Sequence, residues 1–162
     1  MERHLIVNSV HNSSRSQIAE AFLRKYAGNI YDAYSAGFDP KAISPYAIKA
    51  MEEIGYDISN QWPKDLRQLT RNKFFAVAIT VCKKAEEEGC PTILGAGARL
   101  NCRIDNPENL EISQEEKLAK FREVRDQIQE LVKSFLSQKG IVIHNGMTSG
   151  TAKRKEKRTT DN

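Results

Sequence analysis

The segment with the most distinctive chemistry is residues 9–17, Ser-Val-His-Asn-Ser-Ser-Arg-Ser-Gln, which lies between a short apolar run at residues 5–7 and a helical pattern. In a parallel α/β sheet, ligands bind beyond the carboxyl ends of the strands, often in the loop that enters the first helix. Free backbone N–H groups and the helix dipole favour a bound anion there, and the planar guanidinium of Arg15 matches two oxygens of a tetrahedral oxyanion. The segment therefore predicts an oxyanion site, the alternative being an ordinary polar loop with a solvated arginine.

The elements that would position this loop alternate between strands and helices along the chain. The expected strands cover residues 5–7, 30–36, 74–81 and 99–104, and the expected helices begin at Arg15, Pro45 and Ser113. Residues 56–72 are expected to be irregular. Ser113 and Glu116 fit a capping box ahead of the last helix, whose apolar stripe runs to Phe135. The alternation predicts the α/β class, with a parallel sheet and helices on both faces.

The length and the charge distribution predict one domain with a basic tail. A chain of 162 residues suits a single compact domain. Of its 25 basic and 21 acidic residues, six basic and two acidic ones lie in residues 139–162, which leaves 19 of each in residues 1–138. This balance argues against a nucleic-acid-binding fold. We expect residues 1–138 to form the domain and residues 139–162 a disordered basic tail, which could alternatively touch nucleic acid or an anionic membrane.

The sequence also bears on the compartment of the protein. No apolar run approaches the ~20 residues that span a bilayer, and the N-terminal residues turn polar too early for a secretory signal peptide. Three cysteines do not make the framework of paired disulfides of a small secreted protein. We therefore expect a protein of the reducing cytoplasm without a membrane partner.

The loop motif, His11-Asn12-Ser13-x-Arg15-Ser16-Gln17 after a short strand, resembles a known phosphate-binding loop. It is similar to that of the low-molecular-weight protein tyrosine phosphatases and of their relatives, the thioredoxin-coupled arsenate reductases. The resemblance covers roughly residues 4–137. Its other motifs are Tyr34-Ser35-Ala36-Gly37, Asp57-Ile58-Ser59, Thr80-Val81-Cys82 with Cys90-Pro91, and residues 121–126.

The resemblance implies a flavodoxin-like fold, with a four-stranded parallel sheet flanked by helices, and a binding site for arsenate, phosphate or sulfate. The implied oxyanion-binding residues are Ser9, Val10, His11, Asn12, Ser13, Ser14, Arg15 and Ser16. In the reductases, a loop cysteine attacks arsenate, and two further cysteines, matching Cys82 and Cys90, carry the oxidation outward as a disulfide that thioredoxin reduces. A potassium ion can lie beneath the loop, and the matching positions are Asn12, Glu20, Ser35 and Asp65.

The sequence departs from the family at the two positions that carry the chemistry. The family's loop reads Cys, five residues, Arg, Ser, which places the nucleophile at position 9, where this chain has Ser9. A serine hydroxyl is not ionised by the surroundings that make a thiolate; it needs a general base, for which His11 is the nearby candidate. The phosphatases also use an aspartate just before a proline as general acid. That position is Asn106 here, and an amide has no proton to donate at a useful pKa.

Three interpretations of these departures stay open. Asn8, Cys102 and Arg103 also differ from the family pattern on the walls of the same site, which favours a natural, catalytically impaired relative that still binds oxyanions. Alternatively, the chain is a Cys-to-Ser variant of an active arsenate reductase or phosphatase. A third possibility is a regulatory or redox-sensing protein that acts through a partner.

Cys82 and Cys90 could keep a redox role without a cysteine at position 9. The pair could switch between dithiol and disulfide, or could simply be two unpaired cytosolic thiols. Zinc binding with Cys102 and a histidine is disfavoured because the C-x2-C spacing of metal sites is absent.

Overall fold

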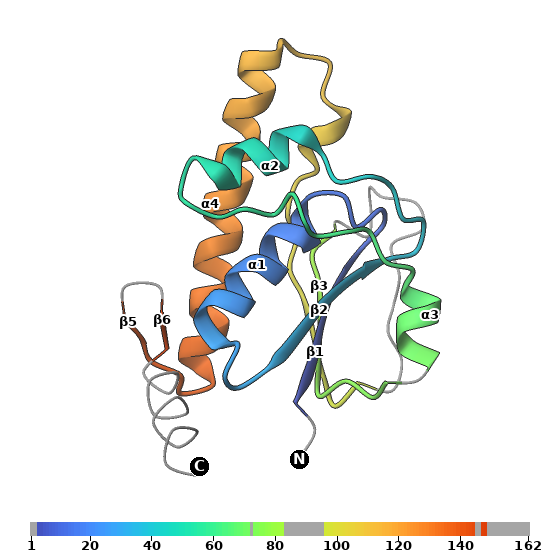
Figure 1. Cartoon of the computed structure of the whole chain (residues 1–162), viewed down its shortest axis with the longest axis vertical. Coiled ribbons are helices and arrows are strands. Elements are labelled where there is room, and N and C mark those ends of the chain that lie inside the picture. The colour runs from blue at the N-terminus through green and yellow to red at the C-terminus, as the bar shows by residue number, and fades with distance from the viewer. Residues whose placement is uncertain (1–2, 72, 83–95, 145–146, 149–162) are drawn as a thin grey trace, which may run out of the picture.

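The computed structural model describes residues 3–71, 73–82, 96–144 and 147–148. Its elements, shown in Figure 1, alternate between strands and helices as expected for the α/β class. The strands are β1 (His4–Ser9), β2 (Asp32–Gly37), β3 (Val77–Thr80), β4 (Ala98–Asn101), β5 (Ile143–His144) and β6 (Met147–Thr148). The α-helices are α1 (Arg15–Ala27), α2 (Pro45–Glu52), α3 (Leu66–Arg71) and α4 (Gln114–Gln138), and η1 (Pro107–Asn109) is a 3₁₀ turn.

Four parallel strands form the central sheet in the order β2-β1-β3-β4. β1 lies inside the sheet, and its residues Leu5, Ile6 and Val7 have no exposed surface, which explains its continuous apolar sequence. The order β2-β1-β3-β4 confirms the predicted flavodoxin-like sheet. Because all four strands are parallel, their carboxyl ends meet at one edge, where the loop after β1 begins.

Helices cover both faces of the sheet (Figure 1). The larger core cluster joins one side of β1, through Leu5 and Val7, to α1, α2 and α4. The smaller cluster on the opposite side joins Ile6 to Leu66 of α3 and to Phe75. Alternate side chains of β1 therefore enter different cores, as the period of a strand requires.

The long helix α4 confirms the predicted apolar stripe. Its fully or nearly fully buried apolar residues are Phe121, Val124, Ile128, Val132, Phe135 and Leu136. At its start, the Ser113 hydroxyl accepts a hydrogen bond from the Glu116 backbone N–H at 3.2 Å, as a serine N-cap does. α4 packs on α1 and α2, and so fixes the helix that carries the loop.

Two segments differ from the sequence-based expectation. Residues 56–72, expected to be irregular, contain α3, because the Asp65 carboxylate accepts from the Arg67 backbone N–H at 2.8 Å and caps the helix. α3 has six residues, too few to show a helical period in the sequence. In the segment expected to be a tail, β5 and β6 pair as an antiparallel hairpin. Residues 149–162, which hold most of the basic residues of the expected tail, lie outside the described residues.

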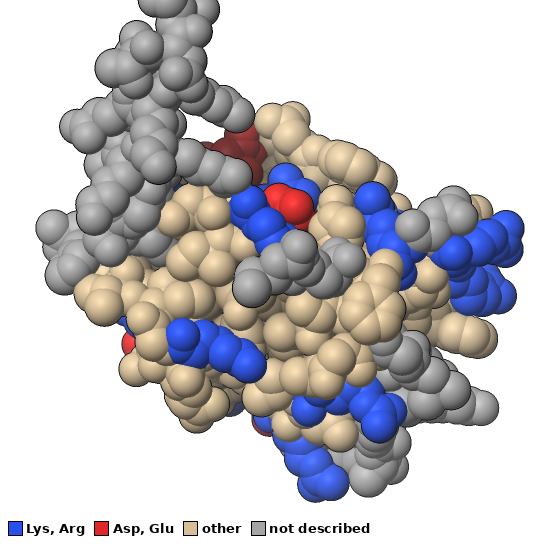
Figure 2. Space-filling model, turned by 90° about the horizontal axis from the view of Figure 1, so that it is seen from below, with Lys and Arg blue, Asp and Glu red and all other residues tan. Residues whose placement is uncertain are grey.

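The described surface and helices bear on the kinds of larger partner that the protein could contact. Figure 2 shows Lys and Arg side chains in several separate groups on one face, rather than joined in a single basic stripe of the kind that follows a nucleic acid backbone. Among the described residues, no helix has both the length and the hydrophobicity to cross a membrane.

We expect Ile128→Ala to lower the free energy of unfolding by about 2–5 kcal/mol, because a fully buried side chain at the α1–α4 contact is replaced by a cavity. The neighbouring exposed residue gives the matched control. Gln127→Ala should change the free energy of unfolding by no more than about 0.5 kcal/mol. Urea unfolding followed by circular dichroism measures both, and equal effects of the two variants would contradict the packing described here.

Candidate oxyanion-binding site

The loop between β1 and α1 is held through its carbonyl groups by a neighbouring segment of the chain. Three of these carbonyls accept hydrogen bonds from the backbone of segment 39–44. The pairs are Asp39 N to Val10 O at 2.8 Å, Lys41 N to His11 O at 3.0 Å and Ser44 N to Ser13 O at 2.9 Å. Within the described part of the chain, no group accepts from the backbone N–H groups of Val10, His11, Ser13 and Ser14. These donors are therefore available to an anion.

Asn12 fixes the turn of the loop. It is fully buried and has a positive φ of 52°, the left-handed conformation that Asn tolerates better than most residues. Its side-chain Oδ1 accepts from Gln17 Nε2 and from the Lys64 backbone N–H, both at 2.9 Å. Its Nδ2 donates to Ser16 Oγ at 2.8 Å. The side chain thus ties the loop to α1 and to the segment after residue 60.

Gly37, the last residue of β2, lets the loop pack directly on the sheet edge. A Cβ at this position would lie 2.8 Å from both Asn12 N and Val10 O, closer than side-chain carbons approach backbone atoms. The Gly37 N–H also donates to the Lys64 carbonyl at 2.9 Å. Residue 37 must therefore be a glycine for the loop to keep this position.

Ser9 lies at the start of the loop with its hydroxyl enclosed. The side chain is 3% exposed, and Oγ accepts from the Asn12 backbone N–H at 3.1 Å and lies 2.8 Å from Ser16 Oγ. His11 Nδ1 instead lies 3.0 Å from the Asp39 carbonyl and 3.6 Å from its carboxylate. Among the described side chains, none that could remove a proton contacts Ser9 Oγ, so the structure gives no support to Ser9 as an activated nucleophile.

Arg15 places a buried positive charge between the loop and the next two strands. Its side chain is 3% exposed, and Nη1 donates to the Ile104 carbonyl at 2.9 Å and to the Val81 carbonyl at 3.4 Å. These carbonyls lie just beyond β4 and β3. Arg15 therefore lies at the same carboxyl edge as the loop donors, which is where the sequence predicts an oxyanion-binding arginine.

The position of the family's general acid and the cysteines have different surroundings. The Asn106 side chain accepts from the Glu108 backbone N–H at 3.1 Å and caps η1. Cys82 is buried and disulfide-bonded, whereas Cys90 lies outside the described residues. Cys102 is free, and burial raises the pKa of its thiol, which keeps it protonated at neutral pH. The described residues contain no cluster of three or more His, Cys, Asp or Glu side chains that could hold a metal ion.

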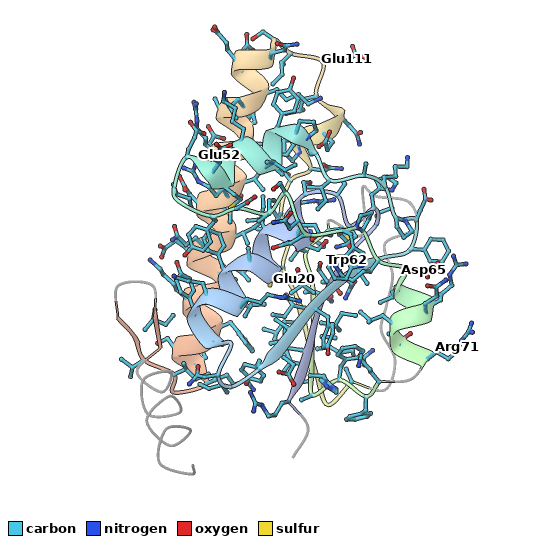
Figure 3. All side chains as sticks on the ribbon, viewed as in Figure 1. Glu20, Glu52, Trp62, Asp65, Arg71 and Glu111 are labelled. Atoms are coloured by element: carbon cyan, nitrogen blue, oxygen red, sulfur yellow. The ribbon has the colours of Figure 1, made fainter. Side chains whose placement is uncertain are left out.

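Only part of the predicted potassium set comes together. Glu20 Oε1 accepts from the Ser35 backbone N–H at 2.9 Å and from Ser35 Oγ at 3.2 Å. The Asp65 carboxylate instead binds the Arg67 side chain, with Oδ2 3.0 Å from Nη2. Figure 3 shows Asp65 at the start of α3 and Glu20 on α1, with Trp62 between them in that view.

Sequence reasoning missed two polar contacts next to the loop. Asn8, which differs from the family pattern, is paired with β3: its Oδ1 accepts from Thr80 Oγ1 at 3.2 Å, and its Nδ2 donates to the Ile79 carbonyl at 3.3 Å. The second contact joins Lys64 to α1, with its Nζ 3.6 Å from Glu20 Oε1. Burial lowers the pKa of Lys64 and Glu20 partly opposes this. The sequence around Lys64 contains no signal that would have identified it.

Comparison with known proteins assigns the fold and the loop to one family. The family model described as low molecular weight phosphotyrosine protein phosphatase matches residues 4–142. An arsenate reductase of Halalkalibacterium halodurans is 41% identical over 124 residues, which cover 76% of this chain and 88% of that protein. The chain belongs to the low molecular weight phosphotyrosine protein phosphatase family, which confirms the resemblance found in the sequence.

Solved structures agree with this assignment. An arsenate reductase in the phosphate binding state is 26% identical with a TM-score of 0.67, over 85% of this chain and 98% of that one. A thioredoxin-dependent arsenate reductase of Corynebacterium glutamicum is 29% identical with a TM-score of 0.57, over 85% of this chain and 63% of that one. The arsenate reductases are thus among the proteins most similar to this chain in both sequence and structure.

We expect Gly37→Ala to lower the free energy of unfolding by about 1–3 kcal/mol, the usual cost of overpacking, because the new Cβ would meet the backbone of Asn12 and Val10. Urea unfolding measures the effect. If the variant were more stable than the wild type, as the lower chain entropy of alanine alone would give, the loop would not be packed on β2 as described.

Proposed function

We propose that the protein binds arsenate, phosphate or a similar tetrahedral oxyanion in the loop of residues 9–16, and that it turns this ligand over poorly or not at all. One observation carries the proposal: the four loop N–H groups of Val10, His11, Ser13 and Ser14, which have no acceptor among the described residues, lie at the carboxyl edge of the sheet where Arg15 is buried. Preorganised N–H groups and a buried guanidinium are the donors that hold an oxyanion in a dry site. A relative of similar fold is an arsenate reductase in the phosphate binding state, which supports the proposal.

Ser9 suits binding better than catalysis. If Ser16, whose Oγ accepts from Asn12 Nδ2, donates its proton to Ser9, then both lone pairs of Ser9 Oγ are used and its own proton is left for a bound anion. A neutral hydroxyl also avoids the repulsion between a thiolate and an oxyanion. Compared with a site that has a cysteine thiolate at position 9, this site therefore has the same hydrogen-bond donors and lacks the negative charge of the thiolate.

Two features argue that the chemistry of the family is impaired here. Reduction of arsenate to arsenite takes two electrons, which thiols supply in the reductases that the chain resembles, and the Ser9 oxygen cannot supply them. The Asn106 amide cannot protonate the leaving oxygen of a phosphate ester, and its Oδ1 is engaged by the Glu108 backbone N–H. Both the nucleophile position and the acid position thus lack the required group.

A second function is favoured by the disulfide-bonded state of Cys82. We propose that Cys82 takes part in a dithiol–disulfide switch, with Cys90 as the partner that the resemblance implies, and that a thioredoxin reduces it in the cytoplasm. The likeness to a thioredoxin-dependent arsenate reductase supports this partner. Cys82 directly follows Val81, whose carbonyl accepts a hydrogen bond from Arg15. Oxidation or reduction of Cys82 would therefore take place one residue away from a contact that holds Arg15.

We expect Arg15→Ala to weaken phosphate binding at least tenfold, because removal of a charge-assisted donor costs about 1.5–3 kcal/mol. Isothermal titration calorimetry measures the affinity, and circular dichroism verifies the fold. Arg15→Lys keeps the charge without the planar fork and should bind with intermediate affinity. Arg99→Ala, at an exposed position of β4, is the matched control and should bind as the wild type does. Unchanged affinity in folded Arg15→Ala would contradict the proposed site.

We expect the wild type to show no thioredoxin-coupled arsenate reduction and Ser9→Cys to acquire it, because the thiol supplies both the nucleophile and the electrons. Adding Asn106→Asp to Ser9→Cys should raise hydrolysis of p-nitrophenyl phosphate about 10²–10⁴-fold, the usual contribution of a positioned general acid. Reductase activity is followed as NADPH consumption in the presence of thioredoxin and thioredoxin reductase. Wild-type activity equal to that of Ser9→Cys would show that Ser9 does not impair the enzyme.

A further inference from the structure

Beneath the loop lies a buried carboxylate that needs a positive neighbour. Glu20 of α1 is 1% exposed, and Oε1 accepts from both the backbone N–H and the hydroxyl of Ser35. An ionised carboxylate in such a place is costly unless it is paired as well as hydrogen-bonded. The cation that neutralises the Glu20 carboxylate therefore contributes to the stability of the loop above it.

Two cations of the chain itself approach this carboxylate: Arg24 Nη2 lies 3.8 Å from Oε1 on a side chain that is 56% exposed, and Lys64 is the more buried of the two. Its Nζ lies 3.6 Å from Glu20 Oε1 and donates to the Trp62 carbonyl at 2.8 Å, and its side chain is only 14% exposed. The lysine backbone is fixed on both sides, since its N–H donates to Asn12 Oδ1 and its carbonyl accepts from Gly37. Lys64 thus contacts Glu20, Asn12 of the loop and Gly37 at the end of β2.

The donor set does not fit a potassium ion, which the resemblance places at Asn12, Glu20, Ser35 and Asp65. Asn12 Oδ1 already accepts two hydrogen bonds, from Gln17 Nε2 and from the Lys64 backbone. The Asp65 carboxylate accepts three from Arg67, two from its side chain and one from its backbone N–H. A further cation beside Glu20 would also be repelled by the Lys64 ammonium and the Arg24 guanidinium.

We propose that the Lys64 ammonium is a built-in cation that replaces a monovalent metal ion beneath the loop, so that neither the fold of the loop nor oxyanion binding depends on potassium. An ammonium on a flexible stem is a compact point charge with three donors, and here it uses a carboxylate and a main-chain carbonyl, the oxygen types that a potassium ion would take. For oxyanion binding, the inference rests on the proposed function. For the stability of the loop, it stands by itself.

The test compares thermal unfolding in potassium chloride and in choline chloride of equal ionic strength, in phosphate-free buffer. The wild type should unfold at the same temperature in both salts. Lys64→Met keeps the aliphatic bulk and opens the cation position beside Glu20, so we expect it to be less stable in choline and to regain about 2–4 °C in potassium. Lys133→Met removes an exposed lysine that pairs with Glu130 and should show no difference between the salts.

Two further variants keep the inference falsifiable if Lys64→Met fails to fold in choline. Lys64→Arg keeps the positive charge and should remain independent of potassium. Lys64→Met combined with Glu20→Gln removes the carboxylate together with its buried ammonium partner, and should fold without any dependence on potassium. A specific stabilisation of the wild type by potassium, or an unstable Lys64→Met that potassium does not rescue, would overturn the inference.

The phosphate affinity of the same proteins separates this inference from the proposed function. We expect wild-type affinity to be equal in potassium and choline, and the affinity of Lys64→Met to be restored by potassium. If the wild type bound no phosphate in either salt, the proposed function would fail. Rescue of Lys64→Met unfolding by potassium would then still support Lys64 as the internal cation.

Discussion

The site depends on one backbone constraint, the left-handed turn at Asn12 pressed against the end of β2. Around this turn, the carbonyls of Val10, His11 and Ser13 accept from segment 39–44, whereas the N–H groups of the same three residues have no acceptor among the described residues. Without a Cβ at Gly37, the sheet edge can approach the turn closely enough to support it. The amide of Asn12 then holds Gln17 and Lys64 in place. The contacts around the loop of residues 9–16 thus fix its backbone conformation, and with it the positions of its backbone N–H groups.

Charged side chains lie in two places around this loop, at the carboxyl edge of the sheet and beneath the loop. Arg15, buried at the carboxyl ends of β3 and β4, supplies the positive charge that would face an anion under the proposed function. Beneath the loop, the Glu20 carboxylate is paired with the buried Lys64 and the exposed Arg24, and its contact with Lys64 links α1 to the segment after Trp62. The neutral Ser9 adds no negative charge between these two places. This distribution of charge is what the proposed oxyanion binding at the loop requires.

The sequence predicted what depends on local patterns. Three elements could be predicted in this way: the strand at residues 5–7, the helix from Arg15 and the long helix after Ser113. Each is marked within its own segment, by an apolar run, by apolar residues at helical spacing or by a capping box. The positions of Ser9 and Arg15 follow from the same local motif. The pairing of Asn8 with Thr80 depends on the register between β1 and β3, which no single segment encodes. The contact of Lys64 with Glu20 and the helix α3 likewise arise only when distant segments pack together.

The most direct test of the account is a calorimetric titration of arsenate into the wild-type protein, repeated with the protein saturated with phosphate. The account predicts saturable binding of one arsenate per chain and its loss when phosphate is present, because both anions would use the same N–H groups and Arg15. Absence of arsenate binding, or binding that phosphate does not displace, would contradict the claim that the loop holds tetrahedral oxyanions.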